Sequence, residues 1–323
     1  MKPKTELLDN SNFHLMKDLE IKKILVPINY DEISKNALDF AMAISRRYNA
    51  MIQLIHVFDS FQYISISRHG LLINLSKKSI LSSETRRLQR FANEVMNNST
   101  DLYSVECRAG NVSRAIVEAA HEFGSDLIIM GINGTSGVSG SEAYEVIEAA
   151  PCPVLTIPKR QSLTEFKEVL FPVRPITGAL EKYDFVKKII DPNKAHLTVL
   201  GLINEEEPCQ TNLFSESITD LENCFLRDKT NADMVFVNTD SAAETVLNKS
   251  QYLGIDLIVI TANIDNEDQH FFMEPYADQI VNRANVPVLS LNSRIVALHF
   301  DDSLLPSQSN ETDAKPLECQ EVY

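Results

Sequence analysis

The chain carries the same set of sequence landmarks twice, and this internal repeat limits its fold more than any other feature. Residues 23–27, 123–130 and 152–157 match residues 168–172, 253–260 and 286–291, in the same order. A repeat separated by well over a hundred residues corresponds to a whole domain, because solenoid repeats are only about 20 to 50 residues long. The 323 residues therefore divide into two related domains.

Within each repeat, short apolar runs alternate with helical patterns. In the first repeat we predict strands at residues 24–28, 51–58, 102–107, 127–130 and 154–157, and helices that begin near Ser34, Ser83, Ser113 and Ser141. Three of these strands are continuous apolar runs, which is typical of a parallel sheet covered by helices on both faces. The predicted fold class is therefore α/β, with two tandem doubly wound five-stranded parallel-sheet domains. Ligands of such sheets bind at the carboxyl ends of the strands.

Changes in composition mark the domain boundaries. We place an N-terminal extension at residues 1–20, the first domain at 21–158, a linker at 159–166, the second domain at 167–293 and an acidic, largely disordered tail at 294–323.

Charge and cysteine content restrict the partners and the compartment. The net charge of −15 disfavours nucleic acid and anionic membranes as partners, because both are polyanions. The five cysteines include no C-x-x-C pair, so we expect reduced thiols and a cytoplasmic protein, with Cys107 and Cys152 buried. No segment is long and apolar enough to suggest a membrane span. His56 ends a strand, and we expect a structural role for it.

A glycine-rich segment follows the fourth predicted strand. Gly131, Gly134, Gly137 and Gly140 precede Ser141, which stands where the next helix begins. Such a turn brings backbone N–H groups and a helix N-terminus close to an anion. The alternative is that the glycines only form a tight turn. The segment contains no G-K-[ST] and no G-x-S-x-G, so it is neither a Walker loop nor a nucleophile elbow.

Five motifs occur here in a characteristic order. They are Val26-Pro27-Ile28-Asn29, His56-Val57, residues 126–131, the glycine segment ending at Gly140-Ser141, and Cys152-Pro153-Val154-Leu155. Together they resemble the universal stress protein family in its tandem form, which has a Rossmann-like fold related to the adenine nucleotide alpha hydrolases. The resemblance covers residues 21–158 and, more weakly, 167–292. It implies that the domains pair through their fifth strands, here residues 154–157 and 288–291.

The resemblance also implies a ligand site, because one branch of the family binds ATP and another does not. Contacts to adenine and ribose would involve Pro27, Asn29 and Val57. Met130 belongs to the same implied site. The phosphate contacts would come from Gly131, Gly134, Gly140 and Ser141. Two positions depart from the ATP-binding pattern: Asn29 stands where the family has aspartate, and five residues separate Gly134 from Gly140 where that pattern has nine.

The second domain lacks these features. Residues 261–268 contain no glycine but include Asp265, Glu267 and Asp268, and Glu274 stands where the later glycine would be. Negative side chains repel phosphate. We therefore expect no nucleotide in the second domain.

These observations lead to one expectation and two alternatives. We expect a stress-response module that binds ATP or another adenine nucleotide in the first domain only. The first alternative is a nucleotide-free module that binds proteins, and the second, with the least support, is a slow ATP hydrolase. No general base or P-loop lysine is visible, so we expect no enzyme activity beyond this. No histidines have metal-ligand spacing, with each other or with a cysteine, that recurs in both repeats, so we expect no metal site. Pairing of the two domains would occupy both fifth strands within a monomer. A homodimer is also possible, and it would need another surface.

Overall fold

The computed structural model describes residues 21–58, 64–66, 72–74, 77–96, 102–133, 142–159, 166–174, 179–190, 194–203, 211–262 and 276–292. The elements of its first half are β1 (Lys23–Pro27), α1 (Glu32–Tyr48), β2 (Met51–Phe58), β3 (Ile64–Ile66), β4 (Leu72–Asn74), α2 (Lys77–Met96), β5 (Tyr103–Ala109), α3 (Val112–Phe123), β6 (Leu127–Ile132), α4 (Glu142–Ala149) and β7 (Val154–Pro158). Those of its second half are β8 (Glu168–Val173), α5 (Ala179–Ile189), β9 (His196–Ile203), α6 (Thr211–Asp228), β10 (Asn231–Asn238), α7 (Ala242–Tyr252), β11 (Leu257–Ala262), α8 (Tyr276–Arg283) and β12 (Val288–Asn292).

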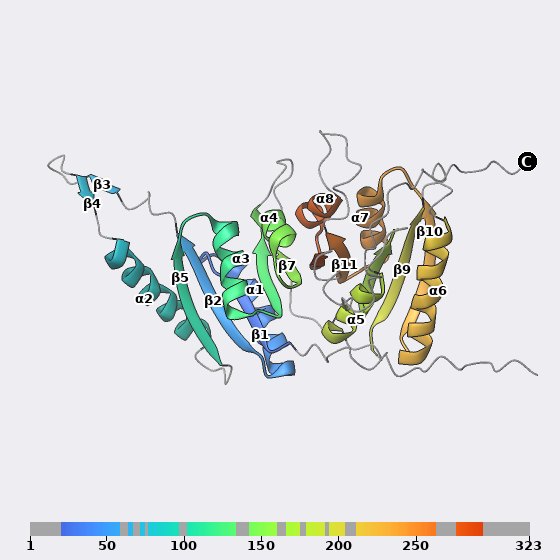
Figure 1. Ribbon diagram of the computed structural model, residues 1–323, viewed down its shortest axis with the longest axis horizontal. Helices are drawn as coiled ribbons and strands as arrows, with labels where there is room; N and C mark the ends of the chain where they lie inside the picture. Colours follow the sequence, from blue (N-terminus) through green and yellow to red (C-terminus); the bar gives the residue numbers. More distant parts are fainter. Residues whose placement is uncertain are drawn as a thin grey trace, which may run out of the picture.

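The two halves share one ten-stranded sheet, in the order β10-β9-β8-β11-β12-β7-β6-β1-β2-β5 (Figure 1). Within each half the strands are parallel and follow the same doubly wound order, as predicted. The halves meet where β7 and β12 pair antiparallel, with Leu155 opposite Leu289. These are the two strands for which the family resemblance implies pairing. A small antiparallel pair, β3 and β4, was not predicted.

Side-chain contacts reinforce the junction between the halves. Thr156 Oγ1 donates to the Val288 carbonyl at 3.2 Å, and Asn292 Nδ2 donates to the Glu148 carbonyl at 2.6 Å. On the other face of the sheet, an Arg47 guanidinium nitrogen donates to the Ile189 carbonyl at 2.7 Å. Both faces therefore join the halves into one structure.

One repeated landmark has a structural cause. Asp126 accepts hydrogen bonds from the backbone N–H groups of Lys22 and Lys23 at 2.8 and 2.9 Å, and so fixes the start of β1 against β6. Asp256 does the same for Lys167 and Glu168 at 2.8 and 3.2 Å. The aspartate that precedes the fourth strand of each domain therefore aligns the central strands.

Helix ends follow local capping chemistry, and two predicted helix starts were wrong. The N-cap of α1 is Asp31, not Ser34, because Asp31 Oδ1 accepts from the Ser34 N–H at 2.8 Å. A carboxylate at the N-cap accepts from the first free N–H groups of a helix, and the helix begins earlier as a result. Gly124 ends α3 with φ of 66°, as predicted. The helix predicted from Ser83 begins at Lys77.

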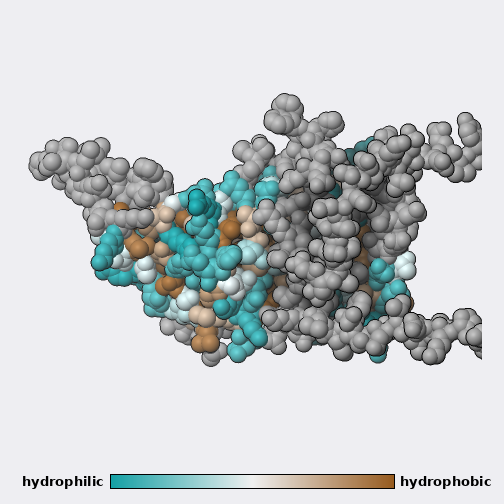
Figure 2. Space-filling model, viewed as in Figure 1, coloured by the Kyte–Doolittle hydropathy of each residue, from teal (hydrophilic) through white to brown (hydrophobic). Residues whose placement is uncertain are grey.

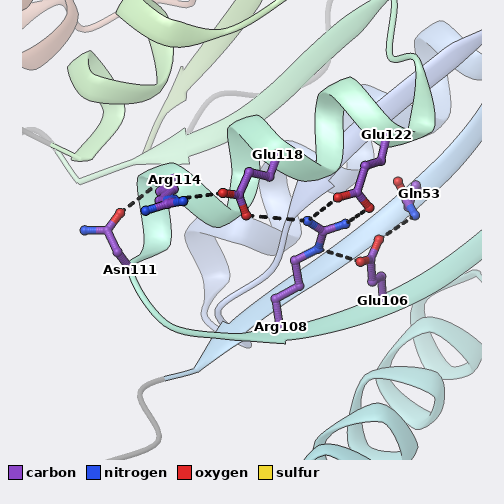
Figure 3. A network of polar contacts seen from close by, with 7 residues as sticks. All are labelled: Gln53, Glu106, Arg108, Asn111, Arg114, Glu118 and Glu122. Atoms are coloured by element: carbon purple, nitrogen blue, oxygen red, sulfur yellow. Dashed lines mark hydrogen bonds and ion pairs between the residues drawn. The ribbon is translucent and has the colours of Figure 1, made fainter.

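An ion-pair network lies at the outer end of the first half (Figure 3). Arg108 on β5 contacts Glu106 at 2.5 Å and Glu122 on α3 at 2.6 Å. Gln53 on β2 donates to Glu106 at 2.9 Å. The network fastens β5 to α3 and places charge beside the end strand. Figure 2 shows the described surface of the first half in the same view as Figure 1. Hydrophilic and hydrophobic residues are mixed there, and hydrophilic residues predominate.

Candidate functional site

The ends of β1, β2 and β6 meet at the point where the strand order reverses. β1 pairs with β2 as far as Pro27, opposite Ile55, but with β6 only at Ile24 and Leu25. Beyond Leu25 the strands β1 and β6 diverge at their carboxyl ends. A crevice at such a reversal is the usual ligand position in a doubly wound sheet.

Five of the predicted site residues come together at these strand ends: Pro27, Asn29, Val57, Met130 and Gly131. Asn29 is exposed, and its backbone N–H donates to Ser34 Oγ at 3.2 Å. Its side-chain amide therefore faces solvent, while its backbone N–H is fixed by the hydrogen bond to Ser34. Val57 is half-buried and Met130 is buried, and both pack against the apolar layer beneath α3 and α4.

The other three predicted residues, Gly134, Gly140 and Ser141, lie outside the described residues. So does the acidic segment of the second domain, from Asp265 to Glu274. For these positions the sequence prediction stays a prediction.

Gly131 has a packing role that the sequence did not reveal. A Cβ atom at this position would lie 2.6 Å from the Ile33 carbonyl oxygen and 2.6 Å from its Cγ2 atom. The first turn of α1 thus packs directly on the backbone of β6, and only glycine permits this approach. Glycine here is explained without a phosphate.

An aromatic and charged cluster borders the site. Tyr30 has a left-handed φ of 60°, and its ring lies 4.5 Å from the ring of His56 and 4.0 Å below the Arg87 guanidinium. His56 Nδ1 is 2.7 Å from the Ile28 carbonyl, and its Nε2 is 3.7 Å from Glu84. His56 is buried and holds the end of β1, which confirms its structural role. Of this cluster, only His56 was singled out from the sequence, because α2 supplies the charged partners from far along the chain.

The second domain places a lysine at the same point. Lys182 on α5 is 4% exposed, and its Nζ donates to the Pro172 carbonyl at 2.5 Å. The Glu168 carbonyl accepts from the Asp256 N–H at the start of β11. Because carbonyls four residues apart on a strand point the same way, the Pro172 carbonyl faces the diverging end of β11. Lys182 therefore fills the crevice from within.

This lysine has an unusual electrostatic setting. Its ammonium lies 4.3 Å from the centre of the Phe171 ring, and burial together with the charge of Arg174 lowers its pKa to about 7. Arg174, which stands at the position of Asn29, lies over the Tyr276 ring at 4.3 Å. By the repeat offset, the counterpart of Lys182 in the first domain is Ala37, which fills much less space. Lys182 was not predicted from the sequence, and the signal that could have identified it is a charged residue within an apolar helix face.

The burial predicted for two of the cysteines is confirmed. Cys107 and Cys152 are buried and unpaired. Burial raises the pKa of Cys107 to about 11 and that of Cys152 still further. Both therefore stay protonated at neutral pH, which makes them poor nucleophiles.

Comparison with known proteins agrees with this geometry. Residues 20–158 match the model of the universal stress protein family. The first half of the chain is a universal stress protein domain. A universal stress protein of Methanocaldococcus jannaschii is 28% identical over 142 residues, which span 43% of this chain and 82% of that protein. A universal stress protein A homologue of Coxiella burnetii is 25% identical over 143 residues, which span 43% of this chain and 97% of that protein.

Solved structures extend the likeness of fold to both halves. A universal stress protein from Archaeoglobus fulgidus aligns with a TM-score of 0.66 at 13% identity, over 84% of this chain and 99% of that one. A functionally unknown protein from Pseudomonas aeruginosa aligns with a TM-score of 0.56 at 14% identity, over 87% of this chain and 96% of that one. At these identities the alignments establish a shared fold of two such halves.

The described residues contain neither a candidate membrane span nor a candidate metal cluster. Within them, no helix combines the length and apolar character that crossing a membrane requires. No three His, Cys, Asp or Glu side chains in this part of the chain are grouped so that they could hold a metal ion.

Proposed function

We propose that this universal stress protein is a stress-response module whose first domain alone binds ATP or another adenine nucleotide. The observation that carries the proposal is the contrast between two equivalent crevices. In the first domain Asn29 and Val57 border the crevice, Met130 is buried beside it, and the small Ala37 of α1 stands at the position equivalent to Lys182. In the second domain Lys182 occupies the crevice.

The residues at the first crevice suit a nucleoside. The exposed amide of Asn29 offers both a donor and an acceptor for ribose hydroxyls or the adenine edge. The half-buried Val57 offers apolar surface to the base, and the buried Met130 packs beside it. The segment with Gly134, Gly140 and Ser141 follows β6 directly in the sequence and would supply the phosphate contacts. Since no nucleophile and base are positioned together among these residues, we infer a binding rather than a catalytic role.

A nucleotide-free protein-binding module is the second candidate. It is favoured by the packing role of Gly131, which accounts for one family glycine without a ligand. The five-residue spacing between Gly134 and Gly140 favours it as well. We also propose a cytoplasmic location for either candidate function, because we expect the cysteines of this acidic protein to be reduced thiols.

The test is to denature protein purified without added nucleotide and to look for ATP, ADP or AMP by chromatography. We expect stoichiometric adenine nucleotide. The matched variant Gly140→Glu gives the first domain the residue that the second domain has at its equivalent position, Glu274. This variant should release none while keeping its far-ultraviolet circular dichroism spectrum. Absence of nucleotide from the wild type, combined with no heat on titration with ATP, would favour the second candidate.

A further inference from the structure

The ten-stranded sheet ends in β5 on one side and in β10 on the other, and these two end strands are built differently. Helix α2 packs along β5, and the Arg108 network places charge beside it. On the other side, α6 packs chiefly on α5. Strand β10 contains the apolar run from Met234 to Val237 and one acidic residue, Asp233. Val235 and Phe236 are 36% and 50% exposed.

The backbone of β10 offers a complete outer edge. All eight of its residues pair with β9, from Asn231 opposite His196 to Asn238 opposite Ile203. The Thr239 N–H donates to the Ile203 carbonyl, so odd-numbered N–H groups face β9 and those of Ala232 and Met234 face outward. No strand in the described part of the chain pairs with this outer side. A long apolar edge of this kind is a template for another strand.

We propose that β10 pairs antiparallel with β10 of a second chain, so that two ten-stranded sheets become one across a twofold axis. The β7–β12 junction supports this choice of partner, because there the chain already joins two equivalent edge strands antiparallel. That junction also places both fifth strands in the interior of the sheet. β10 is then the apolar end strand, whereas β5 carries charge.

The alternation of the strand restricts the register of this pair. The residues of β10 whose backbone N–H and C=O groups face outward are even-numbered. They must therefore form hydrogen bonds with even-numbered residues of the second chain. A twofold axis at Val235 meets this requirement and places Val235 opposite Val235 of the second chain, with Cα atoms about 4.5 Å apart. Asp233 then faces Val237, so that no two carboxylates oppose each other. Within its own chain Asp233 also contacts His196 at 3.1 Å.

The first test is sedimentation velocity of the full chain over a wide concentration range. We expect a species of twice the 36.3 kDa chain mass. Val235→Lys should weaken this dimer roughly 100-fold, because the axis would bring two ammonium groups together in a desolvated pair. Leu226→Lys on α6 is the matched control, since Leu226 is 78% exposed and lies off the strand edge. It should leave the dimer unchanged.

A gentler substitution tests the register itself. The predicted Cα separation lies within the range of a disulfide, so Val235→Cys should form a disulfide-linked dimer under mild oxidation. Leu226→Cys should not form one. Three results would overturn the proposal: a monomer at every concentration, a dimer that Val235→Lys leaves intact, or open-ended filaments, which would indicate β10 pairing with β5 of another chain.

Discussion

The two halves of this chain share a strand order and a structural aspartate, yet they differ at the place where a universal stress protein fold would hold a ligand. In the first half, α1 approaches β6 over Gly131, and the small Ala37 stands at the position equivalent to Lys182. In the second half, Lys182 projects from the equivalent turn of α5 onto the end of β8. The two halves thus share a scaffold and differ in the side chains at this point, of which Lys182 is the clearest example.

The largest expected effect comes from Gly131. Gly131→Ala should lower the free energy of unfolding by about 2 to 4 kcal/mol, because the new methyl group would overlap the backbone of Ile33. The matched variant in the second half is Thr261→Ala, which introduces no such overlap and should cost about 1 kcal/mol or less. Denaturant titration of both variants measures the difference. Equal, small losses would show that α1 does not depend on glycine here.

Lys182 should make stability depend on pH. Burial holds its folded pKa near 7, below its ordinary value of 10.5, so between these values the unfolded chain binds more protons than the folded chain. Stability therefore rises as the pH increases above about 7, by up to about 1.4 kcal/mol per pH unit from this group. In Lys182→Met this contribution is lost, so the difference in unfolding free energy between variant and wild type should change with pH between 7 and 8.5. A constant difference would contradict a buried amine.

The Arg108 network should give a smaller effect. The Arg108 side chain is 16% exposed, but its partner Glu122 is 68% exposed, so solvent screens much of the attraction. We expect Arg108→Met to lower the free energy of unfolding by about 1 kcal/mol, with a smaller loss at high salt. Arg114→Met removes an ion pair with Glu118 on the same helix, in which the two side chains are 80% and 48% exposed, and should change nothing measurable. Equal effects of the two variants would show that β5 is not fastened by this network.

Much of the architecture followed from the sequence because it rests on local and repeated signals. The paired landmarks predicted two equivalent halves, and the continuous apolar runs predicted parallel buried strands. Gly124, with its left-handed φ, ended a helix where expected. The start of α1 was misplaced because Asp31 and Ser34 are both good N-caps, and only the backbone geometry chooses between them.

The site was less predictable because its details depend on contacts between distant residues. Five implied ligand residues do meet at the ends of β1, β2 and β6. The approach of Ile33 to Gly131, however, is a property of how α1 packs and has no sequence signature. Lys182 lies within an apolar helix face of the sequence, but the sequence does not indicate its partner, the Pro172 carbonyl, which the sheet places beside it.

The central claim is that one nucleotide binds per chain, in the first half. Calorimetric titration of the purified, nucleotide-stripped full chain with ATP tests it most directly, with Asn29→Ala and Arg174→Ala as a pair at equivalent positions. The account predicts a stoichiometry of one, weakened roughly tenfold by Asn29→Ala through loss of a hydrogen-bonding group and unaffected by Arg174→Ala. A stoichiometry of two, no binding, or a loss caused by Arg174→Ala instead would contradict it.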